Sequence, residues 1–155
     1  MGTLDILNSK DKKKFLKDLE DQFGIDDLPG KVFLRNNKDK IYMSVRELDL
    51  LPFDSFTIDR IGLYIGKYYA DGFRPSVDGS QVLGPLAKKN VLTVDKEKKH
   101  EWMKGYRIDV DVPDGFYLIK NKDDFLGSAK VKNKEALNAV PKGRRLQVVN
   151  EKVND

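Results

Sequence analysis

The chain has 155 residues, of which 39% are hydrophobic and 35% are charged, and its formal net charge is +4. This composition indicates a globular protein with a modest core and a charge-rich surface, in one domain or two small ones. The absence of cysteine excludes disulfides, thiolate metal sites and cysteine nucleophiles, and a single histidine, His100, excludes a multi-histidine metal centre.

The first predicted element is a helix that begins near Ser9. Asn8 or Ser9 can cap its N-terminus, and the carboxylate of Asp11 favours the positive end of the helix dipole. Gly24 is typical of a left-handed residue that ends a helix. Apolar side chains recur at helical spacing and predict one buried stripe: Phe15, Leu16, Leu19 and Phe23.

Two extended segments follow this helix. Residues 31–35 and 40–45 are rich in β-branched and aromatic side chains, and the Asn- and Asp-containing stretch 36–39 between them predicts a hairpin turn. Residues 46–51 suggest a short helical turn. Because composition and charge balance change after it, we place a domain break near residues 55–58.

The next segment predicts a strand followed by a short helix. Ile61–Tyr69 reads as a strand in which Gly66 marks a bulge or a close backbone approach. Ser76 can cap a helix over residues 77–87, and the Gly84–Pro85 pair inside it indicates a short or distorted helix.

The remaining chain predicts short strands with frequent turns, as in a small barrel. A short charged helix over 95–104 interrupts them, and Trp102 is expected to anchor it to the barrel. The expected strands are residues 90–94, a segment from Tyr106, residues 116–120, residues 125–132 and residues 144–149.

Charge is distributed unevenly along the chain. Residues 1–55 hold 10 Lys+Arg and 11 Asp+Glu, whereas residues 56–155 hold 19 Lys+Arg and 14 Asp+Glu. The basic excess therefore lies in the C-terminal part, which is typical of a region that meets an anionic partner.

The densest basic cluster is the segment Pro141–Arg145. Its three cations, Lys142, Arg144 and Arg145, repel one another, and the flanking Pro and internal Gly predict a shaped turn. A nucleic-acid backbone is the polyanion that such a turn fits best, although a solvated turn before a last strand explains the same residues.

Several short sequence motifs, taken in chain order, resemble those of a PUA domain, the RNA-binding module found with pseudouridine synthases and archaeosine transglycosylases. The resemblance covers about residues 58–149. With the preceding helix and hairpin, the layout resembles a small archaeal group related to the RNA-binding regions of Sun-family RNA cytosine methyltransferases and to ribosome-biogenesis proteins that end in a PUA domain. The residues that carry the resemblance are Gly62–Lys67, Phe73–Ser76, Trp102–Gly105, Phe125–Lys130 and Pro141–Arg145.

The resemblance implies where RNA would bind. It places Arg74, which precedes the helix at 77–87, and Lys88 and Lys89, which follow it, beside an RNA-binding groove, and it adds Lys67 from the preceding strand. Lys142, Arg144 and Arg145 would form the other end of the groove. Side chains of this kind bind phosphates without sequence preference. Cations after a helix are also favoured by its dipole alone.

Aromatic side chains interleave with these cations in the same stretch. Such rings can stack on unpaired bases, but strand alternation requires that some of them face the core. The sequence alone does not separate the two groups. The candidates are Tyr64, Tyr68, Tyr69 and Phe73.

Candidate catalytic groups are scarce. His100 and Glu101 are adjacent on a predicted helix and do not face a common site, and Asp109 and Asp111 fit a solvated strand face. The sequence contains no glycine-rich loop of the kind that binds adenosylmethionine, and methylation of cytosine through a cysteine requires a cysteine. We therefore expect no enzymatic activity, no cofactor and no metal.

The sequence thus predicts an α+β protein. Residues 1–57 would form a helix packed on a small antiparallel sheet, residues 58–149 a PUA-like β-barrel with short helices, and residues 150–155 a tail. The expected function is non-catalytic binding of structured RNA, tRNA or rRNA, in RNA modification or ribosome biogenesis, with an RNA-modifying enzyme or assembly factor as a further partner. The alternative is a protein–protein adaptor that docks through the near-neutral N-terminal part.

The expected location is the cytoplasm, without membrane contact. No apolar run approaches the roughly 20 residues needed to cross a bilayer. The segment Met1–Asp5 also lacks the apolar core of a signal peptide.

Overall fold

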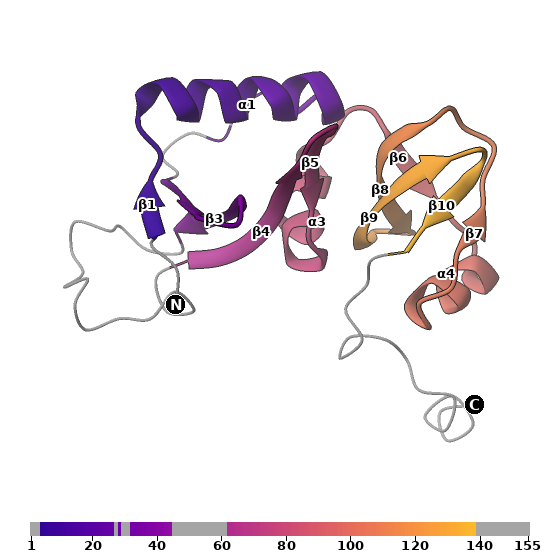
Figure 1. The fold of residues 1–155 in the computed structure, drawn as a ribbon. Helices are drawn as coiled ribbons and strands as arrows, with labels where there is room; N and C mark the ends of the chain where they lie inside the picture. The colour runs from indigo at the N-terminus through magenta and orange to yellow at the C-terminus, as the bar shows by residue number, and fades with distance from the viewer. Residues whose placement is uncertain (1–3, 27, 29–31, 45–61, 139–155) are drawn as a thin grey trace.

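A computed structural model describes residues 4–26, 28, 32–44 and 62–138. These residues form two five-stranded sheets, called sheet A and sheet B, with helices packed on and between them (Figure 1). The predicted α+β class is confirmed. None of the described helices is long and apolar enough to cross a membrane.

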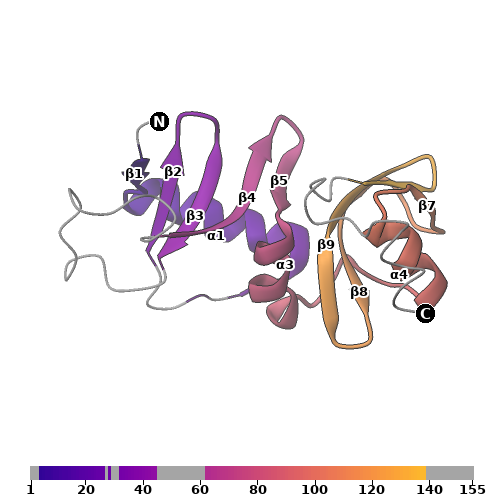
Figure 2. The same ribbon diagram turned by 90° about the horizontal axis from the view of Figure 1, so that it is seen from below.

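Sheet A is antiparallel and contains its strands in chain order. Helix α1, Ser9–Phe23, lies across one face of the sheet, as Figure 1 shows. The other face is turned towards the viewer in Figure 2, with α1 behind it. The strands are β1 (Leu4–Ile6), β2 (Phe33–Asn36), β3 (Lys40–Ser44), β4 (Gly62–Tyr69) and β5 (Gly72–Pro75).

Helix α1 has the ends that the sequence predicts. The side-chain oxygen of Asn8 accepts a hydrogen bond of 2.8 Å from the backbone N–H of Asp11, and Gly24 ends the helix in the left-handed region at φ 67°. Both groups satisfy backbone atoms that the helix itself leaves unpaired. Phe15, Leu19 and Phe23 are buried, as predicted.

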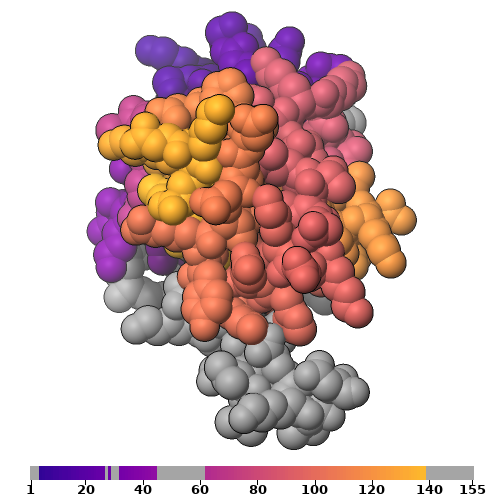
Figure 3. Space-filling model, turned by 90° about the vertical axis from the view of Figure 1, so that its right-hand side faces the viewer, coloured from indigo at the N-terminus to yellow at the C-terminus, as the bar shows by residue number. Residues whose placement is uncertain are grey.

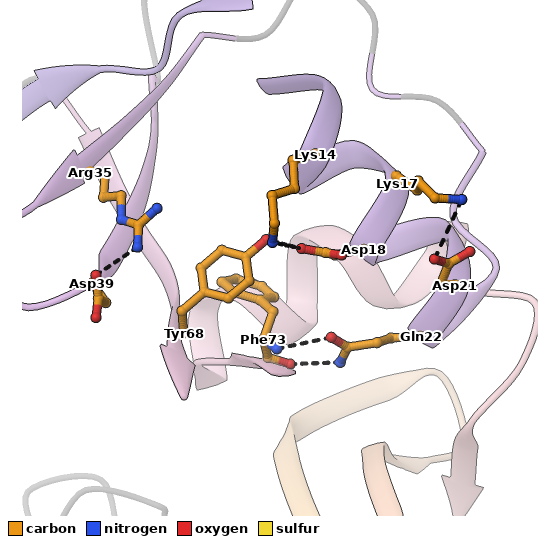
Figure 4. A network of polar contacts seen from close by, with 9 residues as sticks. All are labelled: Lys14, Lys17, Asp18, Asp21, Gln22, Arg35, Asp39, Tyr68 and Phe73. Atoms are coloured by element: carbon orange, nitrogen blue, oxygen red, sulfur yellow. Dashed lines mark hydrogen bonds and ion pairs between the residues drawn. The ribbon is translucent and has the colours of Figure 1, made fainter. Parts of the chain in front are cut away.

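The core beneath α1 is aromatic. The ring of Phe15 lies 5.0 Å from that of Phe33 and 5.0 Å from that of Phe73, in edge-on geometry. At the same interface, the side-chain amide of Gln22 both donates to the backbone O and accepts from the backbone N–H of Phe73 (Figure 4). The amide pair fixes the last turn of α1 over the start of β5.

Strand β4 contains the irregularity that Gly66 predicts. Tyr42 pairs with Tyr64 whereas Ile41 pairs with Gly66, so Ile65 is the extra residue of a bulge. Gly66 has φ 158°, and a Cβ there would lie 2.5 Å from the backbone O of Arg74. Only glycine fits this close approach.

Helix α3, Val77–Leu83, lies between the sheets and is followed by a 3₁₀ turn at Gly84–Leu86. Ser76 caps it by accepting from the backbone N–H of Gly79, as predicted. Gly79 faces the bulge of β4, and a Cβ on it would lie 1.9 Å from the backbone O of Ile65. The helix therefore rests directly on the β4 backbone.

Sheet B is curled and carries helix α4, Lys96–Met103 (Figure 1). The side of the molecule formed by this part of the chain faces the viewer in Figure 3. Trp102 of α4 is fully buried and its indole N–H donates to the backbone O of Leu126 at 2.9 Å, which confirms its anchoring role. In sheet order, the strands are β6 (Val91–Thr93), β8 (Gly115–Asn121), β9 (Asp124–Lys132), β10 (Glu135–Leu137) and β7 (Ile108–Asp109).

Strand β10 was not predicted, because its residues fall between the expected strands 125–132 and 144–149. Lys132 pairs with Glu135 across a two-residue turn in which Asn133 and Lys134 have φ of 54° and 61°. Two left-handed residues are the geometry of a tight hairpin, but the usual Asn-Gly signal is absent here. The expected closing strand at 144–149 lies outside the described residues.

The sheets divide at a different place from the predicted domain break. The break near residues 55–58 lies outside the described residues, and the division into two domains stays a prediction. However, β3 pairs with β4, so residues 62–75, which we expected in the barrel, complete sheet A instead. Sheet B begins only at Val91. A composition change does not reveal which strands pair.

Candidate nucleic-acid interface

The segment that carries Lys88 and Lys89 is fixed to the end of α1. Both backbone N–H groups donate to the backbone O of Phe23, at 2.8 and 3.2 Å, which uses a carbonyl that the helix leaves unpaired. Both side chains are exposed. The ammonium of Lys88 forms an ion pair with Asp26, so Lys89 has the freer charge of the two.

These two lysines line a hollow of about 470 Å³ at the edge of sheet B. Lys120, near the end of β8, lies in the same hollow, where its ammonium is 5.4 Å from the centre of the Phe125 ring. One carboxylate, Asp123, also lines it. Three ammonium groups and one carboxylate line the hollow, and Asp26 pairs with one of the three, Lys88, so the remaining positive charge favours an anion there.

Sequence reasoning missed Lys120. The residue enters the hollow because β6 and β8 pair in parallel, with Thr93 opposite Lys120. This pairing joins segments that are separated by helix α4 in the chain. A lysine in a strand before a turn gives no local signal of such a neighbour.

Lys67 and Arg74 lie elsewhere, on the face of sheet A opposite α1. Lys40 of β3 pairs with Lys67 of β4, and Lys67 pairs with Arg74 of β5, so the three cations form a row across three strands. Their side chains share one face because residues directly opposite each other in a sheet point to the same side. This face is called the open face below.

Arg74 has structural partners that the sequence did not indicate. Its Nη2 donates to the backbone O of Ser128 at 3.3 Å and of Leu137 at 3.1 Å, so it links sheet A to β9 and β10 of sheet B. Burial lowers the pKa of Arg74 from its usual value, although the neighbouring Tyr69 and Tyr64 oppose this shift. Contact between Arg74 and RNA stays a prediction.

The aromatic candidates divide between the two faces of sheet A. Phe73 is fully buried beneath α1, and Tyr68 also points to α1, where its hydroxyl donates to Asp18 at 2.6 Å (Figure 4). Tyr64 and Tyr69 lie on the open face, and Tyr69 is 47% exposed.

The predicted basic turn is not placed relative to these groups. Lys142, Arg144 and Arg145 lie outside the described residues, so their pairing with Lys88 and Lys89 across one groove stays a prediction. Within the described ranges, no group of three or more His, Asp or Glu side chains could hold a metal ion.

One comparison with known proteins covers all strands of sheet B. Residues 89–146 match the family model described as the methyltransferase RsmF PUA domain. The match begins beside the hollow, two residues before β6. The PUA resemblance predicted from the sequence is thereby confirmed for this part of the chain, which is related to the RNA-binding region of the Sun-family methyltransferases.

A curated relative extends the similarity to most of the chain. The chain is 24% identical over 138 residues to the ribosomal RNA small subunit methyltransferase F of Aeromonas salmonicida (strain A449). The aligned part covers 88% of this chain but only 28% of that relative. The chain therefore spans a small part of the length of the methyltransferase that it matches.

Proposed function

We propose that this chain is a non-catalytic RNA-binding protein that acts in the modification of small-subunit ribosomal RNA. The observation that carries the proposal is the lysine-lined hollow at the start of the part that matches the PUA family model. Lys88, Lys89 and Lys120 would bind backbone phosphates there. Such contacts supply affinity without reading the base sequence.

The proposed RNA is ribosomal because the relative is named for a small-subunit ribosomal RNA methyltransferase. The proposed lack of catalysis rests on this chain's own residues. They include no cysteine and a single histidine, His100, which lies on α4 next to Glu101. An RNA-modifying enzyme working beside this protein would supply the chemistry, and the cytoplasm would be the place of both.

A filter-binding titration with small-subunit rRNA fragments tests the proposal. Lys89→Ala and Lys120→Ala are each expected to weaken binding about three- to tenfold near 0.1 M salt, and each to reduce the salt slope by about 0.7–0.9. Lys13→Ala is the matched control and should bind as the wild type does, because Lys13 is an exposed lysine of α1 that stands ten residues before Phe23 and does not line the hollow.

The predicted basic turn has its own test in the same assay. Arg144→Ala combined with Arg145→Ala should weaken binding by at least the same factor, because two cations are removed. Absence of wild-type binding at low salt overturns the proposed function. A partner protein that stays bound in a native lysate after RNase treatment, with no RNA affinity of the purified chain, favours the adaptor alternative instead.

A further inference from the structure

The open face of sheet A carries rings and positive charges side by side. Strand alternation and the register place the outward positions, and none of those in the described strands is Asp or Glu. Figure 2 shows this face towards the viewer. The residues of β3, β4 and β5 on this side are Lys40, Tyr42, Ser44, Gly62, Tyr64, Lys67, Tyr69, Gly72 and Arg74. Ser44 and Gly62 are buried, as is Leu34 of β2 opposite Tyr42, so the exposed part of the face lies towards Tyr69.

The bulge in β4 determines which side chains of this strand lie on the open face. Without it, Tyr64 and Tyr68 would point to the same side, because they are four residues apart in a strand. The extra residue, Ile65, reverses the alternation, so Tyr64 lies on the open face with Lys67 and Tyr69 while Tyr68 lies under α1. The open face thereby gains a ring opposite Tyr42, at 5.6 Å between ring centres.

Lysine side chains cover the two rings in the free protein. The ammonium of Lys40 lies 5.4 Å from the centre of the Tyr64 ring, and that of Lys67 lies 5.3 Å from the centre of the Tyr69 ring. Contacts of this kind are weak at an exposed site, and stacking of a nucleic-acid base on the same ring is stronger. A base can therefore displace each ammonium, whose flexible stem lets it move to a neighbouring phosphate.

We propose that the open face binds unpaired nucleotides of the RNA, with bases stacked on Tyr64 and Tyr69 and phosphates held by Lys40 and Lys67. The inference rests on the proposed function and names its second site, separate from the hollow at Lys89. The charge of the face fits a polyanion, and the rings fit bases of any sequence. Arg74 stays on its carbonyl partners and keeps the open face in register with sheet B.

The test is fluorescence anisotropy of a labelled single-stranded RNA decamer titrated with the full chain. Tyr69→Ala is expected to weaken binding about 5- to 150-fold, which is the loss of one stacked base. Tyr69→Phe keeps the ring and should stay within about twofold of the wild type. Lys67→Ala should reduce the salt slope by about 0.7, because one phosphate contact is lost from a single strand.

The chain offers a matched control for the tyrosine. Tyr106 is 54% exposed and has the ammonium of Lys104 at 5.9 Å from its ring centre, but it follows α4 and belongs to no strand of sheet A. Tyr106→Ala should leave the affinity for the decamer unchanged. An equal loss in Tyr69→Ala and Tyr106→Ala would overturn the proposal.

The outcomes separate this inference from the proposed function. If the rRNA fragments bind through Lys89 and Lys120 while Tyr69→Ala binds the decamer as tightly as the wild type, the stacking site is wrong and the proposed function stands. Absence of binding to either RNA overturns both. Sedimentation that shows a wild-type dimer and a monomeric Tyr69→Ala variant assigns the open face to a second copy of the chain and overturns the RNA assignment.

Discussion

Neighbouring tyrosines of β4 have opposite environments on the two faces of sheet A. On the covered face, the ring of Tyr68 packs 5.3 Å from that of Phe73, and its hydroxyl is bonded to Asp18. On the open face, Tyr69 is 47% exposed beside Lys67. One residue type therefore stabilises the fold on one side and presents a ring to solvent on the other. The comparison predicts that substitutions on the covered face lower the free energy of unfolding, whereas substitutions on the open face weaken the binding of RNA.

The largest expected effect on stability comes from the centre of the covered face. Phe15→Ala should lower the free energy of unfolding by about 3–5 kcal/mol, because it removes a fully buried ring that contacts Phe33 and Phe73. Urea unfolding followed by circular dichroism measures this loss. Tyr69→Ala, on the open face, should change the same quantity by less than about 0.5 kcal/mol. Similar losses in both variants would mean that the open face is part of the core.

A smaller effect on the free energy of unfolding is expected when a single tyrosine hydroxyl is removed from each face. Tyr68→Phe should lower the free energy of unfolding by about 1–2 kcal/mol, because it removes a hydrogen bond to the carboxylate of Asp18. The carboxylate keeps its ion pair with Lys14 at 3.2 Å, which limits the loss. Tyr69→Phe should leave stability unchanged within about 0.5 kcal/mol, and equal unfolding curves for Tyr68→Phe and wild type would contradict the assigned bond.

Local signals in the sequence were sufficient for the elements that depend on local chemistry. Asn8 and Gly24 mark the ends of α1, Ser76 marks the start of α3, and Gly66 marks the bulge, each because one residue type satisfies a specific backbone requirement. The sequence does not contain an equally local signal for strand pairing. The pairing of β3 with β4 therefore placed residues 62–75 in sheet A, contrary to expectation.

The candidate site was less predictable for the same reason. The sequence identified Lys88 and Lys89, but Lys120 joins them only through the parallel pairing of β6 with β8. The sequence also could not sort the tyrosines, because the bulge reverses the alternation between Tyr64 and Tyr68. A glycine within a strand can indicate a bulge in the sequence. The number of extra residues in the bulge depends on how the strand pairs with its partner, which the sequence does not show.

The smallest expected effect concerns the titration of Tyr64, on the open face. Burial, followed by the neighbouring phenols of Tyr69 and Tyr42, raises the pKa of Tyr64 from 10.0 to about 12, while the charge of Arg74 opposes the shift. The folded protein therefore favours the protonated phenol. This contribution to stability is complete below the unfolded pKa of 10.0 and is lost as the pH rises from there towards about 12.

Urea unfolding at about pH 9 and about pH 11 measures the contribution, with Tyr64→Phe as the comparison. The wild type should lose more stability between the two values than Tyr64→Phe, because phenylalanine has no proton to lose. Tyr68, whose pKa is also raised by burial and by Asp18, remains in both proteins and its effect cancels in the difference. Equal losses of stability in the wild type and in Tyr64→Phe would contradict the raised pKa of Tyr64.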